Sequence, residues 1–140
     1  MQTMDTINTA VYKLLNNDET LGGLCTVYKG SRRPEGSTNP AITIESRSLE
    51  SGAGEGIWMC DVVVTTFADV MANRMADYDT IETIVSRVKE MLTDTKLELQ
   101  GAKALPLIAG ESGGPEWTNA HDDETIQEST FGLLYIDYGN

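Results

Sequence analysis

Apolar residues recur at helical spacing in two stretches of the chain. The first follows Asp5 and Thr6, either of which can cap a helix, and it stops at the polar run Asn-Asn-Asp at 16–18. Its apolar positions are Ile7, Ala10, Val11, Leu14 and Leu15. The second stretch, 79–92 (DTIETIVSRVKEML), opens with a capping-box pair three residues apart, and its apolar residues form one stripe. We therefore predict two amphipathic helices.

Alternation of apolar and polar residues predicts the strands. Residues 41–49 place Ile42 and Ile44 on one face, and residues 57–67 are rich in β-branched and aromatic side chains. The glycine-rich turn SGAGEG joins the two segments, which predicts a hairpin whose second strand is apolar on both faces and therefore central. A last strand is predicted at 131–138, with shorter strands at 27–28, at 97–99 and within 104–109.

This order of elements predicts the fold class. Strands in adjacent pairs, with helices at two separate points, favour an α+β fold: a mostly antiparallel sheet with two main helices packed on one face. The length of 140 residues suits a single domain, 1–140. The chain start (MQTMDTINTA) lacks the features of a signal peptide, and the longest apolar run is strand-sized. We therefore expect the chain to stay where it is made and to lack a membrane span.

Charge is unevenly distributed along the chain. The net charge is −12, which disfavours direct binding of nucleic acid phosphates. A basic arm, residues 28–40 (YKGSRRPEGSTNP), carries Lys29, Arg32 and Arg33, and its prolines favour a projecting, extended loop. No Lys or Arg follows Lys103, and a long acidic loop is predicted at 110–127. The asymmetry indicates either a solvated acidic surface or head-to-tail association of identical copies, cationic patch against anionic patch.

Few residues of the chain could carry out catalysis or bind a metal. His121–Asp122–Asp123–Glu124 is the one cluster that resembles an acid/base or metal site, but it holds the single histidine of the chain and does not match an EF-hand loop. No nucleophile elbow or phosphate-binding loop is present, and Cys60 lies in an apolar strand as a small hydrophobe. We predict no catalytic, cofactor-binding or metal-binding residues, and no cofactor. A solvated acidic loop is the preferred interpretation of the cluster.

Trp117 lies within the acidic loop and has two interpretations. It either folds back over the edge of the domain or anchors a protein interface. Taking the second interpretation together with the charge asymmetry, we predict a set of residues at a subunit or partner interface. The set is Arg32, Arg33, Pro34, Trp117, Asp122 and Asp123.

The order of these parts resembles the tail-terminator or tail-completion proteins of long-tailed bacteriophages. The resemblance runs over most of the chain. It begins with a helix ending at a Leu-Gly-Gly turn, followed by the loop YKGSRRPEGSTNP and the strand PAITIE. The hairpin return VVVTTFA, the helix DTIETIVSRVKEML and the strand FGLLYIDY complete it. The chain departs from the family pattern in the loop 110–127, which either serves a specific neighbour or decorates the rim of an assembly.

The resemblance implies an α+β sandwich that assembles as a ring of six copies. Such a ring caps the finished tail tube and joins it to the head connector, so the implied partners are further copies of the chain, the major tail tube protein and the head–tail connector protein. The implied location is the virion, at the head–tail interface, after assembly in the bacterial cytoplasm. It implies no catalytic residues. An excess of carboxylates near the lumen of such a ring would repel phosphates and let the genome slide through.

Three alternatives remain open from the sequence. A head-completion or connector protein of the neck has similar size and is also non-catalytic. A small enzyme or ligand-binding domain would use His121 and the acidic loop. A generic dimerisation module of the host would need no virion at all.

Overall fold

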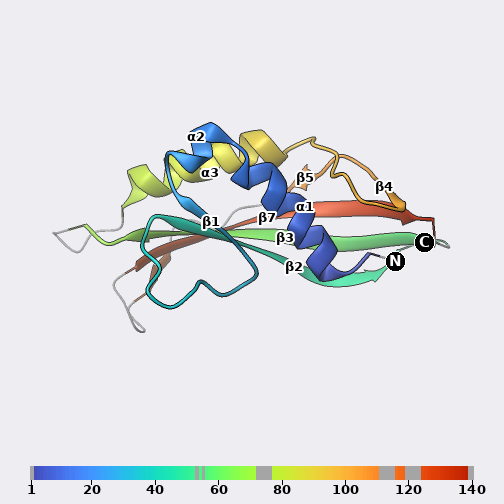
Figure 1. Cartoon of the computed structure of the whole chain (residues 1–140), viewed down its shortest axis with the longest axis horizontal. Coiled ribbons are helices and arrows are strands. Elements are labelled where there is room, and N and C mark those ends of the chain that lie inside the picture. The colour runs from blue at the N-terminus through green and yellow to red at the C-terminus, as the bar shows by residue number, and fades with distance from the viewer. Residues whose placement is uncertain are drawn as a thin grey trace.

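The sheet is built around three long antiparallel strands, shown in the computed structural model in Figure 1. These are β2 (Ala41–Ser51), β3 (Ile57–Asp69) and β7 (Glu124–Asp137), with β3 between the other two. The structure describes residues 2–52, 54, 56–71, 77–110, 116–118 and 124–138. The predicted hairpin and the central position of its second strand are confirmed.

Short strands extend both sides of this sheet. β1 (Thr26–Lys29) pairs in parallel with the first four residues of β2, so the sheet is mixed. On the other side, three short strands pair antiparallel with successive parts of β7. They are β4 (Ala102–Ala104), β5 (Ile108–Ala109) and β6 (Glu116–Thr118). The predicted strand at 27–28 is confirmed, while the segment 104–109 is interrupted around Pro106 and only its ends are paired.

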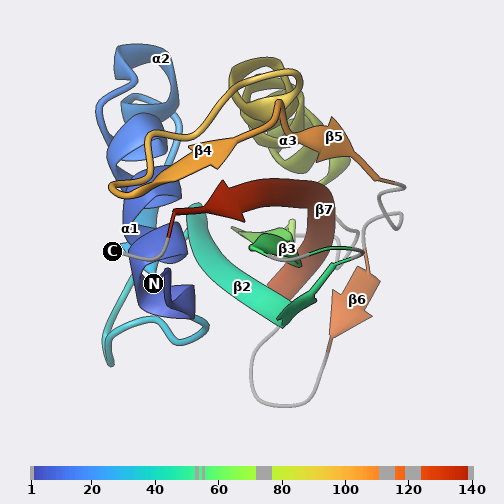
Figure 2. The ribbon, with the colours of Figure 1, turned by 90° about the vertical axis from the view of Figure 1, so that its right-hand side faces the viewer.

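Helices cover one face of the sheet. α1 (Met4–Asn16) and α3 (Tyr78–Leu92) lie on the same side of the curled sheet, as Figures 1 and 2 show. The one-turn helix α2 (Glu19–Gly22) follows α1 and contacts α3. The α+β fold with a mostly antiparallel sheet and two main helices is thus confirmed.

The core lies between the helices and the sheet. The alternation predicted for β2 and β7 is confirmed, because Ile42, Ile44, Phe131 and Tyr135 all point into this core and are at most 1% exposed. Removing these apolar surfaces from water is the main source of stability. The helices contribute Ile7, Val11, Leu15, Ile84, Val88 and Leu92 to the same cluster.

Both helices begin earlier than the sequence pattern predicts. The Thr3 side chain caps α1 by accepting a hydrogen bond from the Thr6 N–H (3.1 Å). Asp77 caps α3 by accepting one from the Thr80 N–H (3.1 Å). The predicted caps Asp5, Thr6 and Asp79 were therefore wrong. They lie in the first turns, where the two acidic side chains suit the positive end of the helix dipole.

The predicted loops and strands also need correction. Residues 97–99 do not form a strand, although Leu97 and Leu99 are both buried. The last strand begins at Glu124 and not at 131, so the final four residues of the predicted acidic loop 110–127 belong to β7. The backbone of 116–118 is likewise in β6. The first two residues of the basic arm are part of β1, and the remainder is loop as predicted. Strand pairing, which a linear pattern does not show, sets these boundaries.

Asp18 and Arg87 connect the α1–α2 corner to α3. The Asp18 carboxylate caps α2 by accepting a hydrogen bond from the Leu21 N–H (2.9 Å). It also accepts two bonds from the Arg87 guanidinium, from Nε (2.9 Å) and Nη2 (2.6 Å). The hydrogen bond from Arg87, helped by that from Leu21, lowers the pKa of Asp18 to about 2. The same pair raises the pKa of Arg87.

We expect stability to fall in acid partly because of Asp18. A carboxyl whose pKa is depressed from 3.8 to about 2 stabilises the fold fully above its unfolded pKa and loses this contribution as the pH falls through 2. Thermal unfolding of the wild type and of Asp18→Asn, measured from pH 7 to pH 2, should show the variant less stable at pH 7, with the difference shrinking in acid. Glu19→Gln on the same short helix is the control. If the unfolding temperatures of the wild type and Asp18→Asn differ by the same amount at every pH, Asp18 does not cause the loss of stability in acid.

Candidate functional site

The basic arm is tied to the end of the sheet through Arg33. Its guanidinium donates to Glu124 Oε1 (2.9 Å) and to Asn39 Oδ1 (2.7 Å), and it lies over the Phe67 ring, 4.0 Å from the centroid. Both members of the ion pair are largely shielded, with side-chain exposures of 20% for Arg33 and 13% for Glu124. Such charge-assisted bonds are stronger than exposed surface pairs.

Asn39 completes this network from the other end of the arm. Its side-chain amide donates to Asp69 Oδ1 (2.9 Å) and to Glu124 Oε2 (2.7 Å). Asp69 and Glu124 are directly opposite each other on β3 and β7, an arrangement that repels when both are ionised. The Arg33 charge and the Asn39 amide offset this repulsion. Sequence reasoning missed Phe67, Asn39 and Asp69 as partners, since nothing local to them marks the contact.

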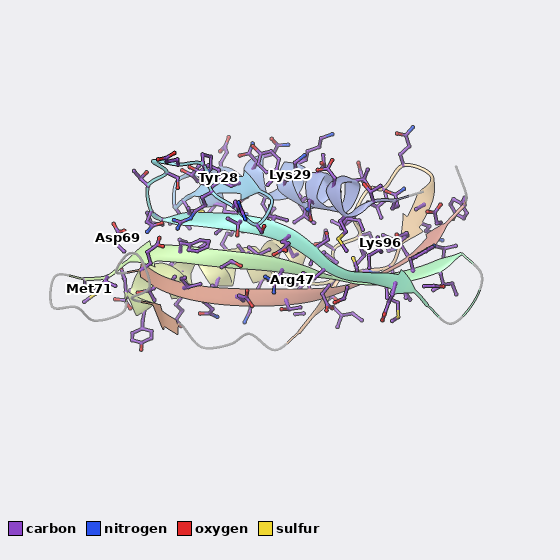
Figure 3. The ribbon with its side chains drawn as sticks, turned by 90° about the horizontal axis from the view of Figure 1, so that it is seen from below. Tyr28, Lys29, Arg47, Asp69, Met71 and Lys96 are labelled. Carbon is purple, nitrogen blue, oxygen red and sulfur yellow. The ribbon has the colours of Figure 1, made fainter. Side chains whose placement is uncertain are left out.

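The two neighbouring arginines of the arm therefore differ in role. Arg32 is exposed and makes no ion pair within the described part of the chain, and Pro34 is also exposed. Arg33 is already neutralised by Glu124, which lies within the predicted acidic stretch of the same chain. The arm is a loop and not a helix, as predicted, and Arg33 and Asn39 hold it against the ends of β3 and β7, where it borders an open hollow. Figure 3 places Asp69 at this end of the sheet.

The face of the sheet away from the helices carries a second charged group. Arg47, midway along the sheet in Figure 3, donates from Nε and Nη2 to Glu45 Oε2 (3.1 and 3.0 Å). It also reaches Glu128 Oε2 across the sheet (3.2 Å). Farther along the same face, toward the end of β7, Met59 and Ile136 are 40% and 38% exposed. This face thus offers ion pairs beside apolar side chains, a composition typical of protein contact surfaces.

Other predicted interface residues fall outside what the structure describes. Trp117 lies in β6, paired with Thr125, and its side chain is not among the described groups, so its two interpretations both stand. Asp122 and Asp123 lie outside the described residues, as does His121. Their place in an interface stays a prediction.

The described residues offer little chemistry of another kind. Burial raises the pKa of the Cys25 and Cys60 thiols to about 11, so both are protonated at neutral pH, and Cys60 is a buried core residue as predicted. Within the described ranges, no three His, Cys, Asp or Glu side chains cluster closely enough to hold a metal ion. Nor is any helix in them long and apolar enough to cross a membrane.

Comparison with known proteins yields a likeness of fold. No family model matches the sequence, and no curated protein does. Among solved structures, 24 chains match. One is a chain of the structure "Virion of native gene transfer agent (GTA) particle", with a TM-score of 0.73 and 17% sequence identity. The match covers 93% of this chain and 94% of that one. At this identity the likeness concerns the fold.

Proposed function

We propose that this chain is a structural protein of a phage-like particle, in which copies form a ring that caps the tail tube and joins it to the head connector. The observation that carries the proposal is the end-to-end likeness of fold with a chain from a gene transfer agent virion, which extends over nearly the full length of both chains. A likeness of that extent includes the two helices, the hairpin and the last strand, the same parts whose order resembles the tail-terminator family.

The surface chemistry supports this role. The charge of −12 disfavours a grip on DNA that passes through a ring. The helix-free face of the sheet presents the ion pairs of Arg47 beside exposed Met59 and Ile136, which suits contact with a protein neighbour. The partners of such a ring are further copies, the tail tube protein and the head–tail connector protein.

Electron microscopy of tail tubes mixed with the purified chain tests this function. The tubes come from the phage or phage-like element that encodes the chain, and the mass of the chain in solution is measured in parallel. We expect one ring on one end of each finished tube. A chain that decorates heads or connectors and leaves tube ends bare indicates a head-completion protein. A chain that binds no particle component contradicts the virion role.

Arg32→Glu provides a variant for the same assay. Arg32 is exposed and makes no ion pair among the described residues, so its reversal tests the arm as an interface without disturbing the Arg33 network. If the arm meets a neighbour, the variant caps fewer tubes than the wild type. Lys89→Glu on α3 is the matched control, since it makes the same change of charge at another residue without an ion pair in the described chain. Equal capping by both variants removes Arg32 from the interface.

A further inference from the structure

The described Lys and Arg residues fall into two groups. Lys29, Arg33, Arg47 and Arg87 form ion pairs within the chain. A second group forms none with the described residues and consists of Lys13, Arg32, Lys89, Lys96 and Lys103. Three members of that second group, Lys13, Lys96 and Lys103, surround the segment 96–101 and line the two hollows on either side of it. In a chain with more than twice as many acidic as basic residues, such a gathering of unpaired lysines is a distinct surface feature.

The larger of the two hollows is a groove. It lies between α1, with Lys13 on its rim, and the segment 96–101. Leu97 and Leu99 are buried beneath it, so its floor is partly apolar. The side-chain amide of Gln2, which is 5% exposed, donates to the Gln100 carbonyl and ties the segment to the start of the chain. We call this surface, with its three lysines, the lysine groove.

The charge of the groove selects an anionic partner. Among the described residues that line the two hollows, one is acidic, Glu98, and three are lysines. The sequence 119–123 (NAHDD), by contrast, carries two carboxylates directly before Glu124 and lies in a region without Lys or Arg. A stretch of this kind complements the groove electrostatically.

The groove runs along α1, from Gln2 to Asn17, and its Gln2 end lies beside the end of β7, where the Gln2 N–H donates to Asp137 Oδ2. Ala102, next to the groove, pairs with Asp137 at the end of β7, whereas Glu124 is the first residue of that strand. A 14-residue strand is roughly 45 Å long. Figure 2 shows α1 and β4 near each other, with the marks of both termini close to them. Thr118 and Glu124, between which the stretch 119–123 lies in the sequence, pair with each other at the start of β7, away from the Gln2 end of the groove.

We propose that the lysine groove binds the acidic stretch 119–123 of a second copy of this chain. The contact joins unlike surfaces, head to tail, and such contacts generate a closed ring when the rotation between copies closes. The inference deepens the proposed function, on which it rests for the ring, by naming the self-association surface. It also revises the charge pairing suggested by the sequence, because Arg33 is neutralised within its own chain and the lysines are not.

A charge exchange tests the groove. The variants are Lys13→Glu with Lys96→Glu, Asp122→Lys with Asp123→Lys, and all four changes combined in one chain. Sedimentation velocity on the purified full-length chain, at low and high salt, measures association. We expect each double variant to weaken association at least about tenfold, since close charge pairs across interfaces carry couplings of this size or more. The combined variant restores it to near the wild-type level, and salt weakens the wild type. Lys89→Glu is the control and leaves association unchanged.

The results separate this inference from the proposed function. If the wild-type chain and both double variants associate equally and cap tubes equally, the groove is not the association surface, and the ring role is unaffected. If both double variants lose association and the combined variant does not recover it, the groove contact is also rejected. If association is lost and recovered as expected but no ring forms on any tube end, the groove contact is supported and the tail-capping role is rejected. If the wild-type chain stays monomeric in solution and forms no ring on tubes, both the groove contact and the tail-capping role are rejected.

Discussion

Replacing Phe131 by Ala should lower the free energy of unfolding by about 3–5 kcal/mol, the range for truncating a buried aromatic side chain. Phe131 is fully buried in the middle of β7, directly opposite Val62 on β3. It belongs to the core cluster that joins the sheet to α1 and α3. Truncation removes apolar burial and leaves a cavity that these rigid elements close only in part. A domain of this size has only about 5–15 kcal/mol of stability in total, so the loss is large.

Urea unfolding followed by circular dichroism measures this loss as a shift of the midpoint at constant slope. Ile108→Ala is the matched control, because Ile108 is 71% exposed on β5 and its truncation removes little burial. Its expected cost lies within about 0.5 kcal/mol. Similar costs for the two variants would place Phe131 outside the core.

Arg33→Ala should destabilise the chain by about 1.5–3 kcal/mol, the range for hydrogen bonds to charged groups. The change removes both guanidinium bonds and the contact with Phe67, and it leaves Asp69 and Glu124 opposite each other without a cation. Arg32→Ala, one residue earlier, should change stability by no more than about 0.5 kcal/mol, since Arg32 is exposed. Urea unfolding of the two single variants measures the difference.

Limited proteolysis gives a second measurement of the same contact. We expect the loop 31–39 to be cut faster in Arg33→Ala than in the wild type, because the network that holds it to the sheet is lost. Arg33→Lys should recover only part of the protection, since an ammonium group cannot reproduce the forked contact. If the two alanine variants are cut at equal rates and are equally stable, the arm is not held by Arg33.

The helical part of the fold could be predicted because its signal is periodic and local. Ile81, Ile84, Val85 and Val88 form one stripe in the sequence, and all four are buried in the structure. The hairpin was equally predictable from alternation on either side of a glycine-rich turn. The starts of both helices were missed by about two residues, because a cap depends on which side-chain oxygen meets a free backbone N–H, while the predicted ends near Asn16 and at Leu92 are confirmed.

The first half of β7 was not predictable from apolar alternation, because its inward-facing positions are polar. Thr125, Gln127 and Ser129 are buried on the helix-covered face, where a strand usually shows apolar residues. The Ser129 and Thr66 hydroxyls lack a hydrogen-bond partner among the described groups. The strand is held in register by thirteen paired positions with β3, which compensate for its polar composition.

The sequence by itself determined the fold class, the two helix stripes, the central hairpin and the excess of negative charge, because each depends on composition or on short-range periodicity. It could not separate Arg32 from Arg33, or single out Lys13 and Lys96 among the basic residues. Glu124 lies 91 residues beyond Arg33, and only the pairing of β3 with β7 brings it to the arm. The tertiary structure decided which charges are neutralised within the chain and which have no ion pair among the described residues, since Coulomb interactions depend on distances in space and not along the sequence.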